Sequence, residues 1–187
     1  MYCFTVLEIL NSSRDGKFIA VGRLEKIKRF DLLIHAWKGI DEKLEIIGDG
    51  LEKNNLQAII KDNNLADQIT IRSEVNSQEL ANIYRRAKGL IITSSREGGP
   101  RVALEASAFN LPVFGTNVGI MGELFPQEVL ADPNNEEEII SLIRSFVPLS
   151  KNIDVSAIKE RIFESYTVES SAKKVGKIYD SVLSNSL

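Results

Sequence analysis

Short runs of β-forming residues alternate along this chain with segments of helical period, and this alternation restricts the fold more than any other feature. The predicted strands are the runs 18–21, 44–47, 69–71, 90–93, 111–114 and 129–130. Strands that alternate with helices in this way pack as a mostly parallel sheet with helices on both faces. The sequence therefore predicts an α/β fold with a sheet of about six strands and a helical C-terminus.

Apolar residues at helical spacing predict the helices between these strands. The first apolar face consists of Phe30, Leu33, Ile34 and Trp37, so we assign Trp37 to the core. Further helices are expected over 51–64, from an Asn76–Glu79 capping pair to Gly89, and over 101–109 with Pro100 as the first helical residue. Two more are expected in the C-terminal part. One covers 136–147 and ends at Pro148, and the other contains Val168, Ala172, Val175, Tyr179 and Val182. No internal repeat or low-complexity linker interrupts the pattern.

The charge balance and the scarcity of cysteine and histidine exclude several classes of function. Lys and Arg total 23 against 26 Asp and Glu, and a net charge of −3 provides no basic field for a nucleic acid partner. Cys3 is the only cysteine and His35 the only histidine, which excludes an internal disulfide or a cysteine zinc site and argues against a Ser-His-Asp triad. Neither a signal peptide nor an apolar run of about 20 residues is present, and we expect a soluble, cytoplasmic chain.

Ligands of an open parallel sheet bind at the carboxyl ends of its strands, so the loops after the strands form the candidate site. The loop after the first strand contains Gly22, Arg23 and Lys28. Arginine and lysine beside a glycine are typical donors to a phosphate or diphosphate. A solvated basic turn is the alternative interpretation of this loop.

The loop 94–101 combines two glycines, a helix start and two carboxylates. Gly98 and Gly99 allow a ligand to approach the backbone closely, and the first turn of the next helix has unpaired N–H groups. Glu97 precedes this helix and Glu105 lies about one turn into it, so both carboxylates can border one cleft and accept sugar hydroxyls. For Glu105 alone, complementing the helix dipole is the alternative role.

The second loop, 48–50, has the first two glycines of a dinucleotide fingerprint but lacks the third, and the chain has no GxxxxGK[ST] motif. Asp49 in this loop can be either structural or ligand-binding. The loop by itself therefore defines no cofactor.

Together these motifs resemble the C-terminal, nucleotide-sugar-binding half of a retaining glycosyltransferase of the GT-B fold, in the "glycosyl transferases group 1" class. The resemblance extends over residues 17–181 and rests on Val21–Leu24 with Lys28 and 31–33, Ile46–Gly50, Glu79, Leu80 and Tyr84, Ser94–Pro100, Leu104–Ala106, and Leu111–Val113. Asn110 stands where the family usually has glycine, and Lys88 where an acidic residue is common. Gly99 and Pro100 replace the usual aromatic-glycine pair, which leaves the donor sugar open.

The resemblance implies a single Rossmann-like βα sandwich and a set of site residues. Arg23, Lys28 and Glu97 would be catalytic, the two cations by holding the donor diphosphate as leaving group and Glu97 by facing the sugar. Glu105 would bind the ribose hydroxyls, and backbone groups around Val75 would meet the base. The full set of implied donor-binding residues is Gly22, Gly48, Asp49, Val75, Gly98, Gly99, Pro100, Arg101, Val102 and Glu105.

The resemblance also implies the reaction and the partners. A nucleoside-diphosphate sugar would transfer its sugar with retention, and neither a cofactor nor a metal would be required. Residues 16–187 would be the donor-binding domain and 1–15 a leftover or linker. The acceptor glycan or lipid would be bound by an absent N-terminal domain, with peripheral membrane contact in the full protein, so we expect little transferase activity from this chain alone.

Two other functions remain open from the sequence. A non-catalytic βα module could bind a nucleotide or a protein, and Arg85, Arg86 and Lys88 could form a basic docking patch. A glycosidase could use Glu97 and Glu105, whose carboxyls would have to lie about 5–9.5 Å apart across a sugar. The glycosidase hypothesis leaves the cations of the first loop without a role.

Overall fold

A computed structural model describes residues 14, 16–150, 155–167, 169–170 and 172–173, and the structural statements below concern these residues. Six parallel strands form one sheet in the order β3-β2-β1-β4-β5-β6. The strands are β1 (Phe18–Val21), β2 (Leu44–Ile47), β3 (Ile69–Arg72), β4 (Gly89–Ile92), β5 (Val113–Thr116) and β6 (Leu130–Ala131). The predicted α/β class and the parallel sheet are confirmed.

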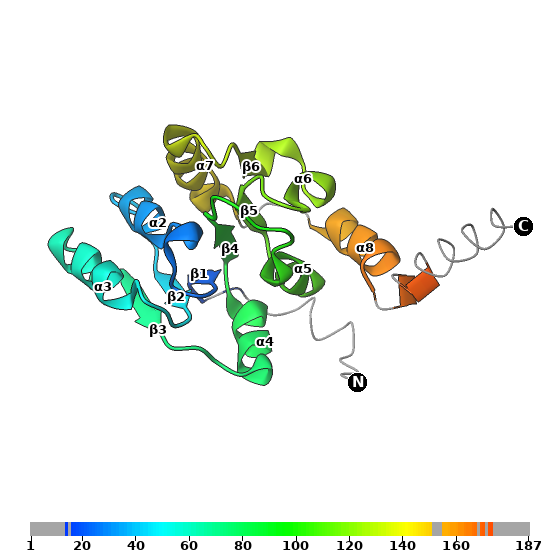
Figure 1. Cartoon of the computed structure of the whole chain (residues 1–187), viewed down its shortest axis with the longest axis horizontal. Coiled ribbons are helices and arrows are strands. Elements are labelled where there is room, and N and C mark those ends of the chain that lie inside the picture. The colour runs from blue at the N-terminus through cyan, green and yellow to red at the C-terminus, as the bar shows by residue number, and fades with distance from the viewer. Residues whose placement is uncertain (1–13, 15, 151–154, 168, 171, 174–187) are drawn as a thin grey trace, which may run out of the picture.

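Helices cover both faces of the sheet (Figure 1). One face carries α2 (Phe30–Ala36), α3 (Lys53–Asp62) and α7 (Glu136–Leu149), and the other carries α4 (Ser77–Arg86) and α5 (Arg101–Ala108), with α8 (Ser156–Ser165) packed on α5. The shorter elements are the 3₁₀ turns η1 (Lys26–Lys28) and η2 (Gln127–Val129) and the single-turn helix α6 (Met121–Leu124). None of the described helices is long and apolar enough to cross a membrane.

Aromatic side chains fill the centre of the core, as the helical spacing predicts for Trp37. The Phe18 ring lies edge-on to Trp37 at 5.7 Å between centroids and to Phe114 at 6.4 Å. Trp37 is fully buried, and its indole N–H donates to the Glu42 carbonyl over 2.9 Å. A buried indole needs such a partner, so Trp37 is a core residue and has no surface left for a ligand.

Three predicted helix boundaries are wrong. Gly89 begins β4 instead of ending α4, because it pairs with Phe18, and a Cβ at Gly89 would lie 3.0 Å from the Phe18 ring. Pro148 lies inside α7, which continues to Leu149; a proline in the last turn removes only one backbone hydrogen bond. Pro100 is the N-cap of α5, with extended backbone, and Arg101 is the first helical residue.

The C-terminal prediction is only partly comparable with the structure. Helix α8 lies over a segment for which the sequence analysis predicts no element. Of the predicted last helix, Val168, Val175, Tyr179 and Val182 lie outside the described residues, as does Cys3, whereas 169–170 and 172–173, with Ala172, are described and helical. The Asn76 cap of α4 is confirmed, because its side-chain oxygen accepts from the Glu79 N–H over 2.9 Å.

Arg14 binds the C-terminal ends of two helices. Its guanidinium donates to the carbonyls of Tyr84 and Ala87 at the end of α4 and to those of Phe109 and Asn110 at the end of α5, over 2.8–3.3 Å. The last carbonyls of a helix lack intrahelical partners and carry partial negative charge, which suits a cation. Arg14 thereby attaches the segment before β1 to the body of the domain.

Asn110 adopts a backbone conformation that suits glycine best. Its φ of 56° lies in the left-handed region, where only glycine is free of strain and asparagine is the best-tolerated substitute.

We predict that Arg14→Met lowers the free energy of unfolding by about 2 kcal/mol, because partly buried carbonyls lose charge-assisted hydrogen bonds. The melting temperature should fall by roughly 4–8 °C for a chain of this length. Urea unfolding of this variant beside Lys38→Met, an exposed lysine, measures the difference. Equal midpoints for the two variants would show that the four contacts stabilise nothing.

Candidate functional site

The strand order creates a crevice between β1 and β4. The chain leaves β1 toward β2 on one side and β4 toward β5 on the other, so the loops after these two strands diverge at the carboxyl edge of the sheet. Two hydrogen bonds join the loops: Ser95 N–H donates to the Ile27 carbonyl over 2.9 Å, and the Thr93 hydroxyl donates to the Lys28 carbonyl over 2.8 Å. Residues from both loops therefore line one site.

Lys28 and Glu97 meet in this crevice. The Lys28 ammonium donates to Glu97 Oε1 over 2.9 Å, with the side chains only 18% and 15% exposed. The hydroxyl of buried Ser94 donates to the same oxygen over 2.5 Å. A Cβ at Gly22 would lie 3.2 Å from Lys28 Cε, so the lysine side chain runs along the glycine. Three predicted site residues thus lie together, held by Ser94, which the sequence analysis assigned no role.

Arg23 does not join this group. Its guanidinium is 78% exposed and pairs with Glu25 over 2.6 Å. An ion pair this exposed is screened by water and holds the side chain weakly. The Arg23 side chain is therefore exposed and available to a ligand, whereas that of Lys28 is largely buried.

Gly48 and Gly50 bring the loops after β1 and β2 into backbone contact. A Cβ at Gly48 would lie 1.9 Å from the Gly22 carbonyl oxygen, and one at Gly50 would lie 2.4 Å from that of Leu24. Both glycines also have φ values, 151° and 157°, that side chains rarely adopt. No other residue fits at either position, so Gly48 has a structural role.

Asp49 connects the second loop to the third. Its carboxylate accepts from the Lys53 ammonium over 2.6 Å, from the Glu74 N–H over 2.9 Å and from the Ser73 hydroxyl over 3.4 Å. The hydrogen bond from Lys53, followed by that from Glu74, lowers the pKa of the Asp49 carboxyl. Because Val75 follows Glu74, Asp49 sets the position of the backbone predicted to meet the base, which favours its structural interpretation.

Gly98 and Gly99 differ from these tightly packed glycines. A Cβ at Gly98 would meet no atom within 4 Å, and one at Gly99 would meet only Ile120, at 3.9 Å. Neither residue has a φ in the left-handed region. Pro100 follows as the N-cap of α5, and Arg101 and Val102 form the first turn, whose N–H groups have no acceptor within the helix. Among the described residues, the space on the side where a Gly98 side chain would lie is therefore open, although the Gly98 carbonyl packs closely against Gly119.

Glu105 lies on α5 and has partners different from those of Glu97. Its Oε2 accepts from the Tyr84 hydroxyl over 3.1 Å, and its Oε1 lies 3.7 Å from the exposed Arg101 guanidinium. The Tyr84 side chain is buried, and this burial, with the charge of Glu105, raises the pKa of its phenol. The sequence analysis names Tyr84 among the residues that carry the family resemblance but does not predict this contact, because it depends on how α4 and α5 pack.

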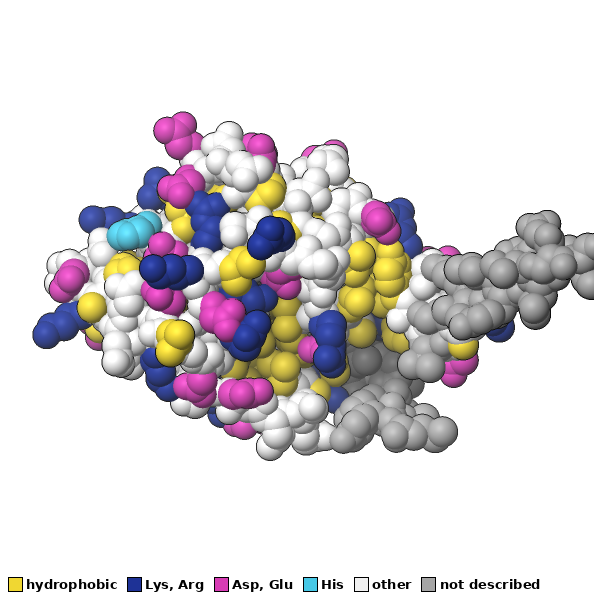
Figure 2. Space-filling view, in the orientation of Figure 1, with side chains coloured by type: hydrophobic (Ala, Val, Ile, Leu, Met, Phe, Trp, Pro, Cys, Tyr) yellow, Lys and Arg dark blue, Asp and Glu magenta, His cyan; other side chains and the backbone are white. Residues whose placement is uncertain are grey.

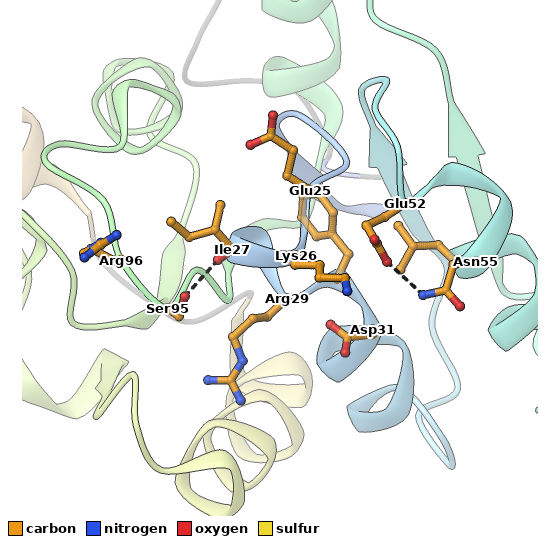
Figure 3. Close-up of a pocket in the computed structure, with 11 residues that line it drawn as sticks. Glu25, Lys26, Ile27, Arg29, Asp31, Glu52, Asn55, Ser95 and Arg96 are labelled. Carbon is orange, nitrogen blue, oxygen red and sulfur yellow. Dashed lines mark hydrogen bonds between the residues drawn. The ribbon is translucent and has the colours of Figure 1, made fainter.

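A cavity of about 730 Å³ lies next to η1 and the loop after β4 (Figure 3). Lys26, Ile27 and Arg29 border it, together with Glu52 of the segment before α3 and with Ser95 and Arg96. None of the predicted site residues lines it. The described part of the chain holds no cluster of three or more His, Cys, Asp or Glu side chains that could bind a metal.

Known proteins resemble the chain in sequence and in fold. The glycosyltransferase MJ1178 of Methanocaldococcus jannaschii is 34% identical over 146 residues, which cover 74% of this chain and 41% of that protein. Sucrose-phosphate synthase of Thermosynechococcus elongatus superposes with a TM-score of 0.79 at 23% identity, over 97% of this chain and 50% of the synthase chain. Anabaena Alr3699/HepE, solved in complex with UDP, superposes with a TM-score of 0.74 at 19% identity, over 94% of this chain and 50% of the HepE chain.

The family model described as "Glycosyl transferases group 1" matches residues 8–178. The chain belongs to this family, as its motifs predicted, and it has the Rossmann-like fold that the resemblance implied. It spans less than half the length of MJ1178.

We predict that Asp49→Asn loosens the loop after β3, because the carboxylate charge that holds the Lys53 ammonium and the Glu74 N–H is lost. Amide exchange measured by NMR should show several-fold lower protection at Glu74, whereas Asp62→Asn, on the exposed end of α3, should change nothing there. In the unmodified chain the pKa of Asp49 is lowered, so its carboxylate stays ionised to a lower pH than an ordinary aspartate. Protection should therefore survive acidification to the ordinary aspartate value of 3.8 and disappear only below it. Unchanged protection in Asp49→Asn would contradict this role.

Proposed function

We propose that this chain binds the nucleoside-diphosphate sugar donor of a retaining glycosyltransferase and supplies the residues that act on it. The observation that carries the proposal is the Lys28–Glu97 pair in the crevice between β1 and β4. A cation and a carboxylate from different loops lie side by side there, next to the open backbone of Gly98 and Gly99. The cation suits a diphosphate, the carboxylate can accept a hydrogen bond from a sugar hydroxyl, and the open space beside the glycines can hold a sugar ring.

The two cations of the first loop would take the charge of the diphosphate. Lys28 is fixed against Gly22 and would bind the phosphate nearest the sugar, while exposed Arg23 would exchange Glu25 for a phosphate oxygen. Charge-assisted hydrogen bonds of this kind are shorter and stronger than neutral ones. They would also stabilise the charge that develops on the leaving group, which lowers the barrier of transfer without requiring a metal.

Glu97 would hold the donor sugar while its anomeric bond exchanges. The bond from the anomeric carbon to the phosphate oxygen would break, and its electron pair would stay on the nucleoside diphosphate. The acceptor oxygen would bond to the same face of the sugar, and its proton would pass to the departing phosphate oxygen. Backbone N–H groups at Arg101 and Val102 would bind the sugar or the phosphate, since the first turn of α5 offers them without an intrahelical acceptor. Pro100 and the two glycines before it would border the sugar.

Glu105 and Val75 would bind the nucleoside. The Glu105 carboxylate, 40% exposed, would accept the ribose hydroxyls, and backbone groups near Val75 would meet the base in the position that Asp49 sets. The complex of HepE with UDP, a protein of similar fold, supports a nucleoside diphosphate as ligand. Gly22 and Gly48 would keep the loops close enough for one ligand to contact both.

We further propose that residues 16–187 form the donor half of a longer cytoplasmic enzyme, with 1–15 as linker. An acceptor glycan or lipid, and any peripheral membrane contact, would then be bound by an N-terminal domain. The coverage of MJ1178, 41% of its length, supports a second domain of comparable size.

The alternative of a basic docking patch loses support from the contacts of its residues. Lys88 pairs with Glu42, and the Arg85 guanidinium lies 5.1 Å above the Phe109 ring. Figure 2 shows Lys and Arg side chains interspersed with Asp and Glu on the face in view. A glycosidase likewise leaves Lys28 without a substrate group to bind, whereas a diphosphate donor provides one.

We predict that one of UDP, GDP and ADP stabilises the chain against heat, because a ligand that binds only the folded state shifts the equilibrium. At 100 times its dissociation constant the ligand adds about 2.7 kcal/mol, at roughly 2–4 °C per kcal/mol. Lys28→Met and Glu105→Gln should each remove most of the shift, and Lys38→Met should preserve it. A flat response to all three nucleotides at millimolar concentration would overturn donor binding by this chain.

We predict that Gly98→Val weakens binding of the nucleotide sugar and leaves binding of the free nucleoside diphosphate unchanged. The fold has room for the added side chain, since a Cβ there meets no atom within 4 Å, but that room is where the sugar would lie. Titration calorimetry with both ligands compares the two affinities, and Gly98→Ala should give a smaller effect in the same direction. Equal losses for both ligands would place the sugar elsewhere.

A further inference from the structure

We propose that Tyr84 is a positioning residue that orients the Glu105 carboxylate for the ribose of the donor. The proposal rests on the proposed function in one respect, the role of Glu105 toward ribose. The observation is a hydrogen bond between helices: the Tyr84 hydroxyl on α4 donates to Glu105 Oε2 on α5 over 3.1 Å. Neither composition nor helical spacing points to this contact.

The Tyr84 ring is held by packing on all sides. Its residue is only 2% exposed, and the ring lies 5.8 Å from that of Phe109, at an angle of 32°. The Arg85 guanidinium covers the Phe109 ring at 5.1 Å. A side chain packed in this way occupies one rotamer, so the place of its hydroxyl is set by the core and does not depend on solvent.

Arg14 fixes the two helices that carry the pair. Its guanidinium donates to the carbonyl of Tyr84 itself over 3.3 Å and to that of Phe109, the C-cap of α5, over 2.9 Å. The backbone at the end of α4 is thereby linked to the end of the helix that bears Glu105. The separation of the hydroxyl and the carboxylate is consequently a property of the fold.

The two oxygens of Glu105 have different surroundings. Oε2 is occupied by the buried phenol, and Oε1 lies on the side of the exposed Arg101, 3.7 Å from its guanidinium. Each carboxylate oxygen accepts more than one hydrogen bond, so both remain usable by a ligand. The phenol thus fixes the plane of the carboxylate without using up its capacity for ribose hydroxyls.

The hydroxyl keeps this role throughout the ordinary pH range. Burial and the nearby negative charge of Glu105 both raise the pKa of the Tyr84 phenol, so it stays protonated and remains a donor. A lysine or arginine in its place would exchange Glu105 for a phosphate when the donor binds, whereas a neutral hydroxyl has no attraction of comparable strength to a diphosphate.

The experiment compares ribose recognition in Tyr84→Phe with that in the unmodified chain. The ligands are the nucleoside diphosphate selected from UDP, GDP and ADP and its 2′,3′-dideoxy counterpart. The measured quantity is the dissociation constant of the dideoxy ligand divided by that of the ribose ligand, which is high when the ribose hydroxyls are recognised. Tyr84→Phe keeps the ring and removes only the hydroxyl. We expect the ratio to fall by about 3–10-fold, the usual effect of one hydrogen bond, with the affinity for the dideoxy ligand nearly unchanged.

The matched control is Tyr166→Phe. The Tyr166 hydroxyl also donates to a glutamate, Glu123, over 3.0 Å, at an exposed place on the other side of α5 near α6 and α8. This variant removes the same atom from the same kind of pair and should leave the ratio unchanged. Thermal midpoints measured without ligand report whether either variant is folded. If the Tyr84 hydroxyl had a purely structural role, Tyr84→Phe would lower the midpoint and leave ribose selection intact.

The outcomes separate this inference from the proposed function. If the unmodified chain binds the ribose and dideoxyribose ligands equally well, the role of Glu105 is wrong and the positioning role falls with it. If Glu105→Gln loses selection while Tyr84→Phe retains the full ratio, the role of Glu105 stands and that of Tyr84 is overturned. If both variants lose selection and Tyr166→Phe keeps it, both statements hold.

Discussion

The pairing of β1 with β4 is the constraint on which the rest of the domain depends. These strands are separated by two complete βα units, and their pairing reverses the direction in which the sheet grows. The reversal opens a crevice at the carboxyl edge and brings the loops after both strands to it. Gly89 makes the pairing possible, because it lies opposite Phe18 and a Cβ at this position would lie only 3.0 Å from the Phe18 ring.

The regular elements could be predicted from the sequence because their signals are local. The strands β1 and β2 lie where the apolar runs place them, and Asn76 caps α4 as its spacing to Glu79 indicates. What could not be predicted depends on contacts between distant residues. Arg14 contacts carbonyls more than 70 positions along the chain, and no property of its own neighbourhood indicates that it attaches to two helices. From the sequence alone Gly89 is predicted to end a helix, and only its pairing with Phe18 shows that it begins a strand.

In the candidate site, too, some contacts could be predicted from neighbouring residues and others depend on how distant elements pack. Lys28 and Glu97 meet as expected of residues from adjacent loops, but Arg23 turns to Glu25, because a local carboxylate competes for an exposed side chain. Ser94 could have been found, since it precedes Glu97 by three residues in a loop and a hydroxyl at that spacing can reach a carboxylate. Tyr84 could not, because its contact requires the packing of one helix on another.

Glu97 and Glu105 are both held by hydroxyls from buried residues, and this choice of donor has a physical consequence. If the proposed function holds, an incoming diphosphate would compete with Glu97 for Lys28, since both are anions and the ammonium prefers the more highly charged partner. A carboxylate held only by that cation would be released when the donor arrives. The Ser94 hydroxyl, which donates to Glu97, would keep that carboxylate in place during the exchange, as the Tyr84 hydroxyl would for Glu105 beside Arg101. In the proposed donor complex the cations would then move to the phosphates while the carboxylates stayed in place for the sugar and the ribose.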